Sequence, residues 1–186
     1  MKKIFVVIGG PGTGKSTLVK ALEDKGYYCQ YDDISRQIIE ECVRKGRGVE
    51  TDSYMFNRRL LEKRVEQFEK APENKICFFD RGIPDGIAYM ESPSEEFNEI
   101  ARKYRYQPLV FALPPWKDIF RGRKHDSGRA EESFDEAIRL HEIIVKVYKN
   151  LGYNVIEIPK MTVEERAKFV VGEVAKFETR RRLKFI

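Results

Sequence analysis

"KIFVVIGGPGTGKSTL", residues 3–18, joins a short apolar run to an amphipathic segment through a glycine-rich turn. Gly9, Gly14, Lys15 and Ser16 satisfy the spacing G-x-x-x-x-G-K-[ST], and a strand-like and a helix-like segment flank the motif as it requires. The glycines let backbone N–H groups turn inward around an anion, and the following helix directs its positive dipole end to the same place. The stretch therefore predicts a phosphate-binding P-loop.

The P-loop predicts a binding site for ATP or a related nucleotide, together with Mg²⁺. Lys15 supplies a mobile cation for the β- and γ-phosphates, and the Ser16 hydroxyl suits Mg²⁺. An ordinary glycine-rich turn between a strand and a helix is the alternative explanation. The residues expected to contact the nucleotide are Gly9, Gly10, Pro11, Gly12, Thr13, Gly14, Lys15, Ser16 and Thr17.

Apolar runs and helical patterns alternate along the rest of the chain. The clearest helix covers residues 134–151, where apolar side chains recur at i+3 and i+4 until Gly152. Strands that read as continuous apolar runs between helices are typical of a parallel sheet covered on both faces, which predicts a doubly wound α/β fold. The five strand-like runs are residues 3–8, 27–31, 75–80, 108–113 and 153–158.

Two of these runs end in acidic residues that suit phosphoryl transfer. Asp80 closes the third run, where a P-loop protein places a magnesium-side carboxylate, and Arg81 beside it can reach a phosphate or the acceptor. Asp33 follows the second run and can orient or deprotonate an acceptor hydroxyl, while Arg36 can pair with Asp33 or hold an anionic group of the acceptor. A plain Asp-Arg-Gly turn is the alternative for Asp80, and a helix N-cap is the alternative for Asp33.

Residues 121–132, "RGRKHDSGRAEE", form a charged, glycine-containing interruption before the long helix. Such a loop can act as a lid that closes over the nucleotide, places guanidinium charge on the transferring phosphoryl group and excludes water. A solvated charged loop is the alternative. Its cations are Arg121, Arg123, Lys124 and Arg129, of which Arg121 and Arg123 are expected at the nucleotide and Arg129 at the reacting group.

The two histidines and three cysteines show no metal-binding pattern. His125 lies in the charged loop without suitable partners, and His141 lies on an apolar helix face, where we expect a hydrogen-bonded core imidazole. The cysteines are odd in number and lack CxxC spacing, so we expect reduced thiols.

Length and charge favour one domain with a basic tail. The chain has 186 residues and a net charge of +5, and residues 179–186 hold four Lys/Arg and no acid. We expect a single domain at residues 1–178 and a tail that is solvated or frayed, or that binds a nucleic acid or an anionic membrane. The apolar part of the N-terminus is too short for a signal peptide, and no membrane span follows, so we expect a cytoplasmic protein. The oligomeric state stays open.

Several stretches beyond the P-loop resemble one group of P-loop proteins. They are "FFDRGIPD" at 78–85, "YRY" at 104–106, "VFALPPW" at 110–116, "LGYNVIEIP" at 151–159 and "VEERAKFV" at 163–170. With the P-loop, they resemble the AAA-type "predicted ATPase" family related to the nicotinamide-riboside kinase domain of the bacterial NAD regulator. The resemblance implies a three-layer, kinase-like fold with strand order 2-3-1-4-5 and a lid. It also implies an acidic-x-x-Arg element, matched here by Asp33 and Arg36, although the family more often has Glu at the first position.

The leading interpretation is a kinase that transfers the γ-phosphate of ATP to a small hydroxylated acceptor such as a nucleoside or riboside. In-line transfer needs positioning and charge neutralisation, which Lys15, Ser16, Asp80, Arg81 and the lid arginines supply. One alternative is an ATP-hydrolysing switch that acts on a protein partner. Another is a polynucleotide or phospholipid kinase that uses the basic tail.

Overall fold

The fold was analysed in a computed structural model that describes residues 2–46, 54–90, 94–121 and 133–183. The strands are β1 (Lys3–Ile8), β2 (Tyr28–Gln30), β3 (Ile76–Asp80), β4 (Leu109–Ala112) and β5 (Asn154–Glu157). The helices are α1 (Lys15–Glu23), α2 (Ile34–Arg44), α3 (Tyr54–Lys70), α4 (Ile83–Ala88), α5 (Glu95–Lys103), α6 (Lys117–Arg121), α7 (Phe134–Asn150) and α8 (Val163–Leu183).

The strands form one parallel sheet in the order β2-β3-β1-β4-β5, as the resemblance implied. The central strand β1 pairs with β3 through Val7 and Asp80 and with β4 through Ile8 and Ala112. The carboxyl ends of these three strands therefore meet at one edge of the sheet. The turn after β1 and Asp80 at the end of β3 both lie at this edge, which is where ligands bind in open α/β sheets.

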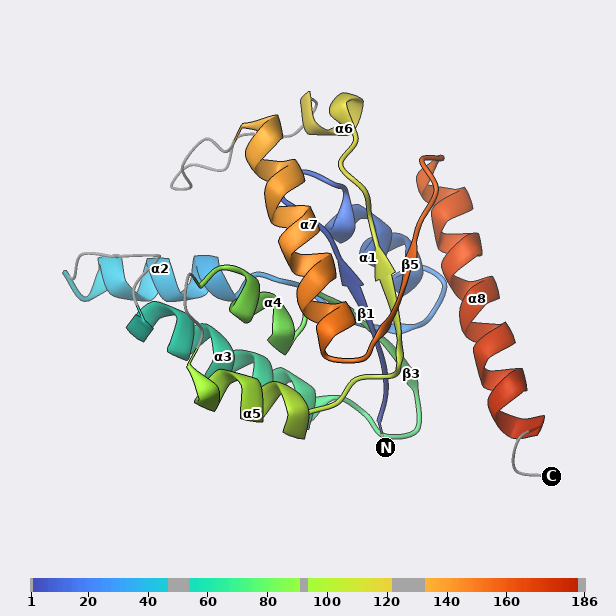
Figure 1. The fold of residues 1–186 in the computed structure, drawn as a ribbon, viewed down its shortest axis with the longest axis horizontal. Helices are drawn as coiled ribbons and strands as arrows, with labels where there is room; N and C mark the ends of the chain where they lie inside the picture. Colours follow the sequence, from blue (N-terminus) through green and yellow to red (C-terminus); the bar gives the residue numbers. More distant parts are fainter. Residues whose placement is uncertain (1, 47–53, 91–93, 122–132, 184–186) are drawn as a thin grey trace.

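Helices cover both faces of the sheet, which confirms the doubly wound α/β prediction (Figure 1). Alternate residues of β1 belong to different cores: Ile4, Val6 and Ile8 pack in one cluster, and Phe5 and Val7 pack in the other. The first cluster includes side chains of α3, α4, α5 and α7, and the second includes side chains of α1 and α8. All five of these strand residues are fully buried, because in this sheet neither face is open to water.

The long predicted helix is α7, which ends at Asn150 just before Gly152. Its N-cap is Ser133, whose hydroxyl accepts from the Glu136 N–H at 3.2 Å while the Glu136 carboxylate accepts from the Ser133 N–H at 2.6 Å. This capping box gives the helix a defined start immediately after the predicted lid.

Helix α8 continues through the first five residues of the predicted basic tail, to Leu183. Arg180 and Arg182 are exposed, whereas Arg181 Nη1 donates to Gln107 Oε1 at 3.3 Å. The described part of the tail is therefore helical, with one arginine tied to the domain. Among the helices described, none is both long and apolar enough to cross a bilayer.

Candidate active site

The predicted P-loop lies between β1 and α1, and Lys15 is the first residue of the helix. Gly14 is the helix N-cap in the left-handed conformation, with φ of 85°, which a residue with a side chain rarely adopts. Gly10 is needed for a different reason, since a Cβ there would lie 2.4 Å from the Ala137 carbonyl oxygen of α7. The loop is thus shaped by its own backbone and by close contact with α7.

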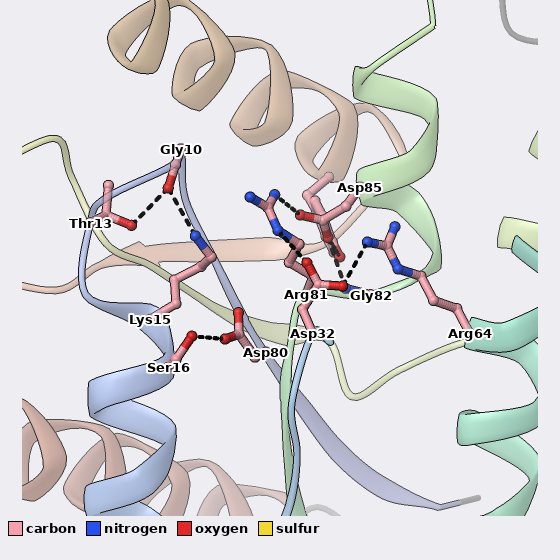
Figure 2. Close-up of polar contacts among 11 residues, drawn as sticks. Gly10, Thr13, Lys15, Ser16, Asp32, Arg64, Asp80, Arg81, Gly82 and Asp85 are labelled. Atoms are coloured by element: carbon pink, nitrogen blue, oxygen red, sulfur yellow. Dashed lines mark hydrogen bonds and ion pairs between the residues drawn. The ribbon is translucent and has the colours of Figure 1, made fainter. Parts of the chain in front are cut away.

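The Lys15 side chain folds back onto the P-loop. Its Nζ donates to the Gly10 carbonyl at 2.8 Å, and the residue is 8% exposed (Figure 2). Thr13 Oγ1 donates to the same carbonyl at 3.0 Å. Burial, and then the positive charge of Arg81, lowers the pKa of the Lys15 ammonium from 10.5 to about 8. An anion in the loop would offset both effects, which suits a phosphate-binding lysine.

Ser16 and Asp80 come together from α1 and β3, as expected for a magnesium site. Ser16 Oγ donates to Asp80 Oδ2 at 2.7 Å, while Asp80 Oδ1 is buried without a hydrogen-bond partner among the described residues. Asp80 is 5% exposed, and burial raises the pKa of its carboxyl group above the ordinary value. A hydroxyl beside a carboxylate with a vacant oxygen fits Mg²⁺, which takes one or two protein ligands and completes its shell with water and phosphates.

Arg81 follows Asp80 in a strained backbone conformation, with φ of 69°. A residue with a side chain in this left-handed region costs about 1–3 kcal/mol, and such strain is common at functional sites. The Arg81 N–H donates to the Val7 carbonyl at 3.0 Å, which extends the pairing of β1 and β3. The guanidinium lies 2.9 Å from Asp32 Oδ2 through Nε and 3.2 Å from Asp85 Oδ1 through Nη1. The turn therefore holds a cation over the carboxyl end of the sheet.

A buried network around Asp85 fixes this turn. Asp85 Oδ2 accepts from the Gly82 N–H at 2.8 Å and from the Tyr148 hydroxyl at 2.6 Å, and Asp85 is fully buried. The Ile83 N–H donates to the Tyr106 hydroxyl at 3.0 Å. A Cβ on Gly82 would lie 2.6 Å from the Tyr148 oxygen, so the close packing requires glycine. Asp85 thus caps α4 and orients Arg81 with the same carboxylate.

The acidic residue that faces Arg81 is Asp32, the neighbour of Asp33, which is the residue predicted as the acceptor-side carboxylate. Asp32 lies between Arg81 and Arg64 of α3, whose Nη2 is 3.4 Å from Asp32 Oδ1, and the Asp32 side chain is 11% exposed. Asp33 is the N-cap residue of α2, is exposed, and accepts from Gln37 Nε2 at 2.6 Å. The structure thus places the predicted acceptor carboxylate on the outer side of this turn. Arg36 is exposed on α2.

The predicted lid arginines cannot be placed in the site. Arg123 and Arg129 lie outside the described residues, together with Lys124 and His125, and Arg121 is the last residue of α6. His141 is buried on α7, with its Cβ 3.5 Å from the position of a Cβ on Gly10. The core placement of His141 is as predicted, and its Nδ1 has no hydrogen-bond partner among the described residues.

Sequence reasoning missed the residues that complete the site from other elements. Asp32, Arg64 and Tyr148 carry no motif, and their roles depend on how α3 and α7 pack on the sheet. Asp85 had a usable signal, because Gly-x-x-Asp with Pro84 inside the first turn is a helix-start pattern. The charged side chains form two adjoining groups, with Lys15 and Asp80 at the P-loop and Asp32, Arg64, Arg81 and Asp85 beside them (Figure 2).

A protein-family model described as an AAA domain, AAA_28, matches residues 4–166. The chain belongs to the AAA_28 family. This AAA_28 domain is 26% identical over 162 residues to a "Nucleotide-binding protein" of Thermotoga neapolitana, an alignment that covers 87% of this chain and 50% of the relative. The chain therefore spans about half the length of the curated relatives it matches.

Solved structures place this AAA_28 domain among kinase-like folds. A crystal structure of NadR protein in complex with NR aligns with a TM-score of 0.66 at 20% identity, covering 92% of this chain and 51% of that chain. Deoxyadenosine kinase from M. mycoides with bound dATP aligns with a TM-score of 0.63 at 15% identity. The alignment covers 93% of this chain and 99% of that chain. The chain therefore has a kinase-like P-loop fold of the nucleotide-binding type, and the resemblance drawn from its motifs is confirmed.

Proposed function

We propose that this AAA_28 domain is a kinase that transfers the γ-phosphate of ATP, in the presence of Mg²⁺, to a hydroxyl group of a small acceptor. One observation carries the proposal: the Asp32–Arg81 pair adjoins the P-loop group of Lys15, Ser16 and Asp80 at one edge of the sheet. In-line phosphoryl transfer needs a nucleotide site next to a polar acceptor site, and these two groups of residues provide that arrangement.

On the nucleotide side, the P-loop N–H groups and Lys15 bind the β- and γ-phosphates. Ser16 and the free oxygen of Asp80 would hold Mg²⁺, which neutralises phosphate charge when bound. In the free protein Lys15 is held by the Gly10 carbonyl, so nucleotide binding exchanges that neutral acceptor for phosphate oxygens. Arg121, Arg123 and Arg129 are proposed to add cationic charge from the lid.

On the acceptor side, Asp32 is proposed to accept the proton of the attacking hydroxyl. The acceptor oxygen forms a bond to the γ-phosphorus, the bond from phosphorus to the β,γ-bridging oxygen breaks, and ADP leaves. The hydroxyl proton passes to the Asp32 carboxylate, which Arg81 and Arg64 hold in place. Arg81 then lies beside the transferring phosphoryl group, where negative charge develops in the transition state. Arg36, in the first turn of α2 after Asp32, is proposed to contact the acceptor.

The charge balance of the described site favours an uncharged acceptor. Lys15, Arg64 and Arg81 provide three cations, and Asp32, Asp80 and Asp85 provide three carboxylates. Arg64 and Arg81 are already paired with aspartate, so neither of these two arginines is a surplus cation for an acidic or phosphorylated acceptor. Neutral hydroxyl groups can instead donate to carboxylate oxygens. A nucleoside or another riboside fits this description.

The experiment that tests this proposal measures ADP formation from ATP and Mg²⁺ with a panel of ribosides, deoxyribosides, nucleoside monophosphates and hydroxy acids. We expect acceptor-dependent ADP formation with an uncharged riboside, with the phosphorylated product identified by mass spectrometry. ADP formed at one rate with and without every acceptor would make water the acceptor. The kinase proposal would then give way to an ATP-hydrolysing switch.

Asp80→Asn is expected to remove the magnesium dependence of ATP binding. An amide is a weaker Mg²⁺ ligand than a carboxylate, whereas ATP without metal should bind Asp80→Asn as well as or better than the wild type, since a carboxylate near the phosphates is lost. The measurement is the Kd of ATP with Mg²⁺ and with EDTA. Because burial raises the pKa of Asp80, the neutral amide should also fold stably. Equal losses under both conditions would contradict the magnesium role.

ATP binding is expected to take up a proton at alkaline pH. The free Lys15 has a pKa of about 8, and phosphate oxygens raise it by stabilising the ammonium form. The free lysine is more often neutral at pH 9 than at pH 7, so the uptake should be larger at pH 9 than at pH 7. Calorimetry without Mg²⁺ in buffers of different ionisation enthalpy measures this number. Uptake near zero at pH 9 would show that Lys15 does not meet the phosphates.

A further inference from the structure

Arg166 is a buried cation of α8 that the site described above does not use. It is 4% exposed, and its Nε is buried without a hydrogen-bond partner among the described residues. No ion pair joins it to a carboxylate in the described part of the chain, although two glutamates precede it. Glu164 pairs with Lys25 at 3.3 Å, and Glu165 accepts from the Thr162 N–H and hydroxyl at 2.9 and 2.7 Å.

The Nε of this guanidinium is buried without an acceptor among the described residues, which is unfavourable for a charged group. Arginine stays protonated in proteins, and a buried charge normally has a counter-charge and hydrogen-bond acceptors. Burial lowers the pKa of Arg166, and no neighbouring carboxylate offsets this effect within the described residues. The free protein therefore holds a cation whose partner is not supplied by the described chain, and an anionic ligand would supply it.

Arg166 lies directly beside the P-loop. Helix α8 packs along α1, and Arg166 Nη1 is 3.2 Å from the position that a Cβ on Gly14 would occupy. Gly14 is the N-cap of α1, where the first backbone N–H groups and the helix dipole already favour an anion. Ile119 of α6 borders the same Cβ position, at 3.8 Å.

We propose that Arg166 binds the phosphate chain of the nucleotide from the α8 side of the P-loop. The inference rests on the proposed nucleotide site and adds to it a cation from a different element than Lys15 and Arg81. Gly14 leaves space for the guanidinium next to the start of α1, so one anion can reach both the helix N–H groups and Arg166. Arg166 is a binding residue in this proposal and takes no part in proton transfer.

The test combines stability and affinity in Arg166→Met, which removes the charge and keeps a long apolar stem. We expect the Tm of the free protein to rise by at least about 2 °C, because an uncompensated buried charge is removed. We expect the Kd of ATP and of inorganic tripolyphosphate, each without Mg²⁺, to rise about 10- to 100-fold, the usual effect of losing a charged hydrogen bond. The Tm and the Kd values of Arg166→Lys should lie between those of the wild type and those of Arg166→Met. Arg180→Met, an exposed change on the same helix, should alter neither quantity.

A ligand-binding role predicts that Arg166→Met raises the Tm and weakens phosphate binding. A purely structural role predicts a lower Tm and unchanged binding. A lower Tm with unchanged affinities would overturn the inference and make Arg166 a structural residue. Weaker binding of ATP with unchanged tripolyphosphate binding would also overturn it, because the contact would then be to the base or ribose. If Lys15→Ala loses ATP binding and Arg166→Met does not, the inference fails and the proposed function stands. If the wild type binds no ATP, the proposed function itself fails.

Discussion

Lys15→Ala is expected to weaken ATP binding about 10- to 100-fold and to lower phosphoryl transfer about 10²–10³-fold. The affinity loss is that of a charged hydrogen bond to phosphate, and the rate loss is that of one preorganised group which stabilises charge in the transition state. Calorimetric ATP titration and acceptor-dependent ADP formation measure the two effects. Lys20→Ala is the matched control, because Lys20 lies on the same helix but is exposed and paired with Glu23 and Asp24.

The fold should survive Lys15→Ala, and its stability should be equal to or above that of the wild type. A pKa lowered from 10.5 to about 8 means that burying the charged lysine costs roughly 3 kcal/mol. This cost is present at pH 7, below the folded pKa, and disappears as the pH rises from about 8 towards 10.5. Unchanged ATP affinity and turnover in Lys15→Ala would overturn the assignment of the P-loop as the nucleotide site.

Asp32→Asn is expected to depress phosphoryl transfer by about 10²–10⁴-fold, the usual contribution of a positioned general base, with little change in ATP affinity. Asp33→Asn is the matched comparison on the neighbouring residue. Asp33 is exposed and Asn caps helices about as well as Asp, so this change should affect neither fold nor transfer. The readouts are the single-turnover rate with the acceptor found in the screen and the Kd of ATP.

Asp32→Asn also removes a counter-charge from buried Arg64, so the loss of activity must be separated from a loss of fold. Breaking a buried ion pair costs about 3–5 kcal/mol, which a Tm measurement would detect. Asp32→Asn combined with Arg64→Gln removes both charges of that pair and leaves Arg81 paired with Asp85, so it should restore part of the stability without restoring transfer. If Asp33→Asn abolishes transfer and Asp32→Asn does not, the general base is Asp33.

The main lines of the fold were predictable because they depend on neighbours in sequence. Apolar runs separated by amphipathic segments indicated a parallel sheet with helices on both faces, and the five observed strands lie within those runs. Their ends differ by a residue at several places, since the last residue of an apolar run can pack without pairing. The contact between Ser16 and Asp80 was also predictable, because parallel strands bring their carboxyl ends to one edge of the sheet.

The sequence could not show that Asp32, and not Asp33, faces Arg81. The two residues follow β2, a strand of three residues, and lie immediately before α2. Consecutive side chains point in different directions at such a junction, and sequence spacing does not decide which one turns inward. The direction is set by the buried guanidinium groups of Arg81 and Arg64, which reach Asp32 from the turn after β3 and from α3.

By itself, the sequence determined the P-loop, the position of Asp80 at the end of the third strand and the layered α/β fold. These features follow from local backbone geometry and from the periodicity of apolar residues. Only the tertiary structure decided that Gly10 must be glycine, that Asp32 faces Arg81 and that Arg166 reaches the start of α1. Each of these depends on how one element docks against another far away in the chain, and docking is decided by side-chain packing and by the pairing of buried charges, which no short motif records.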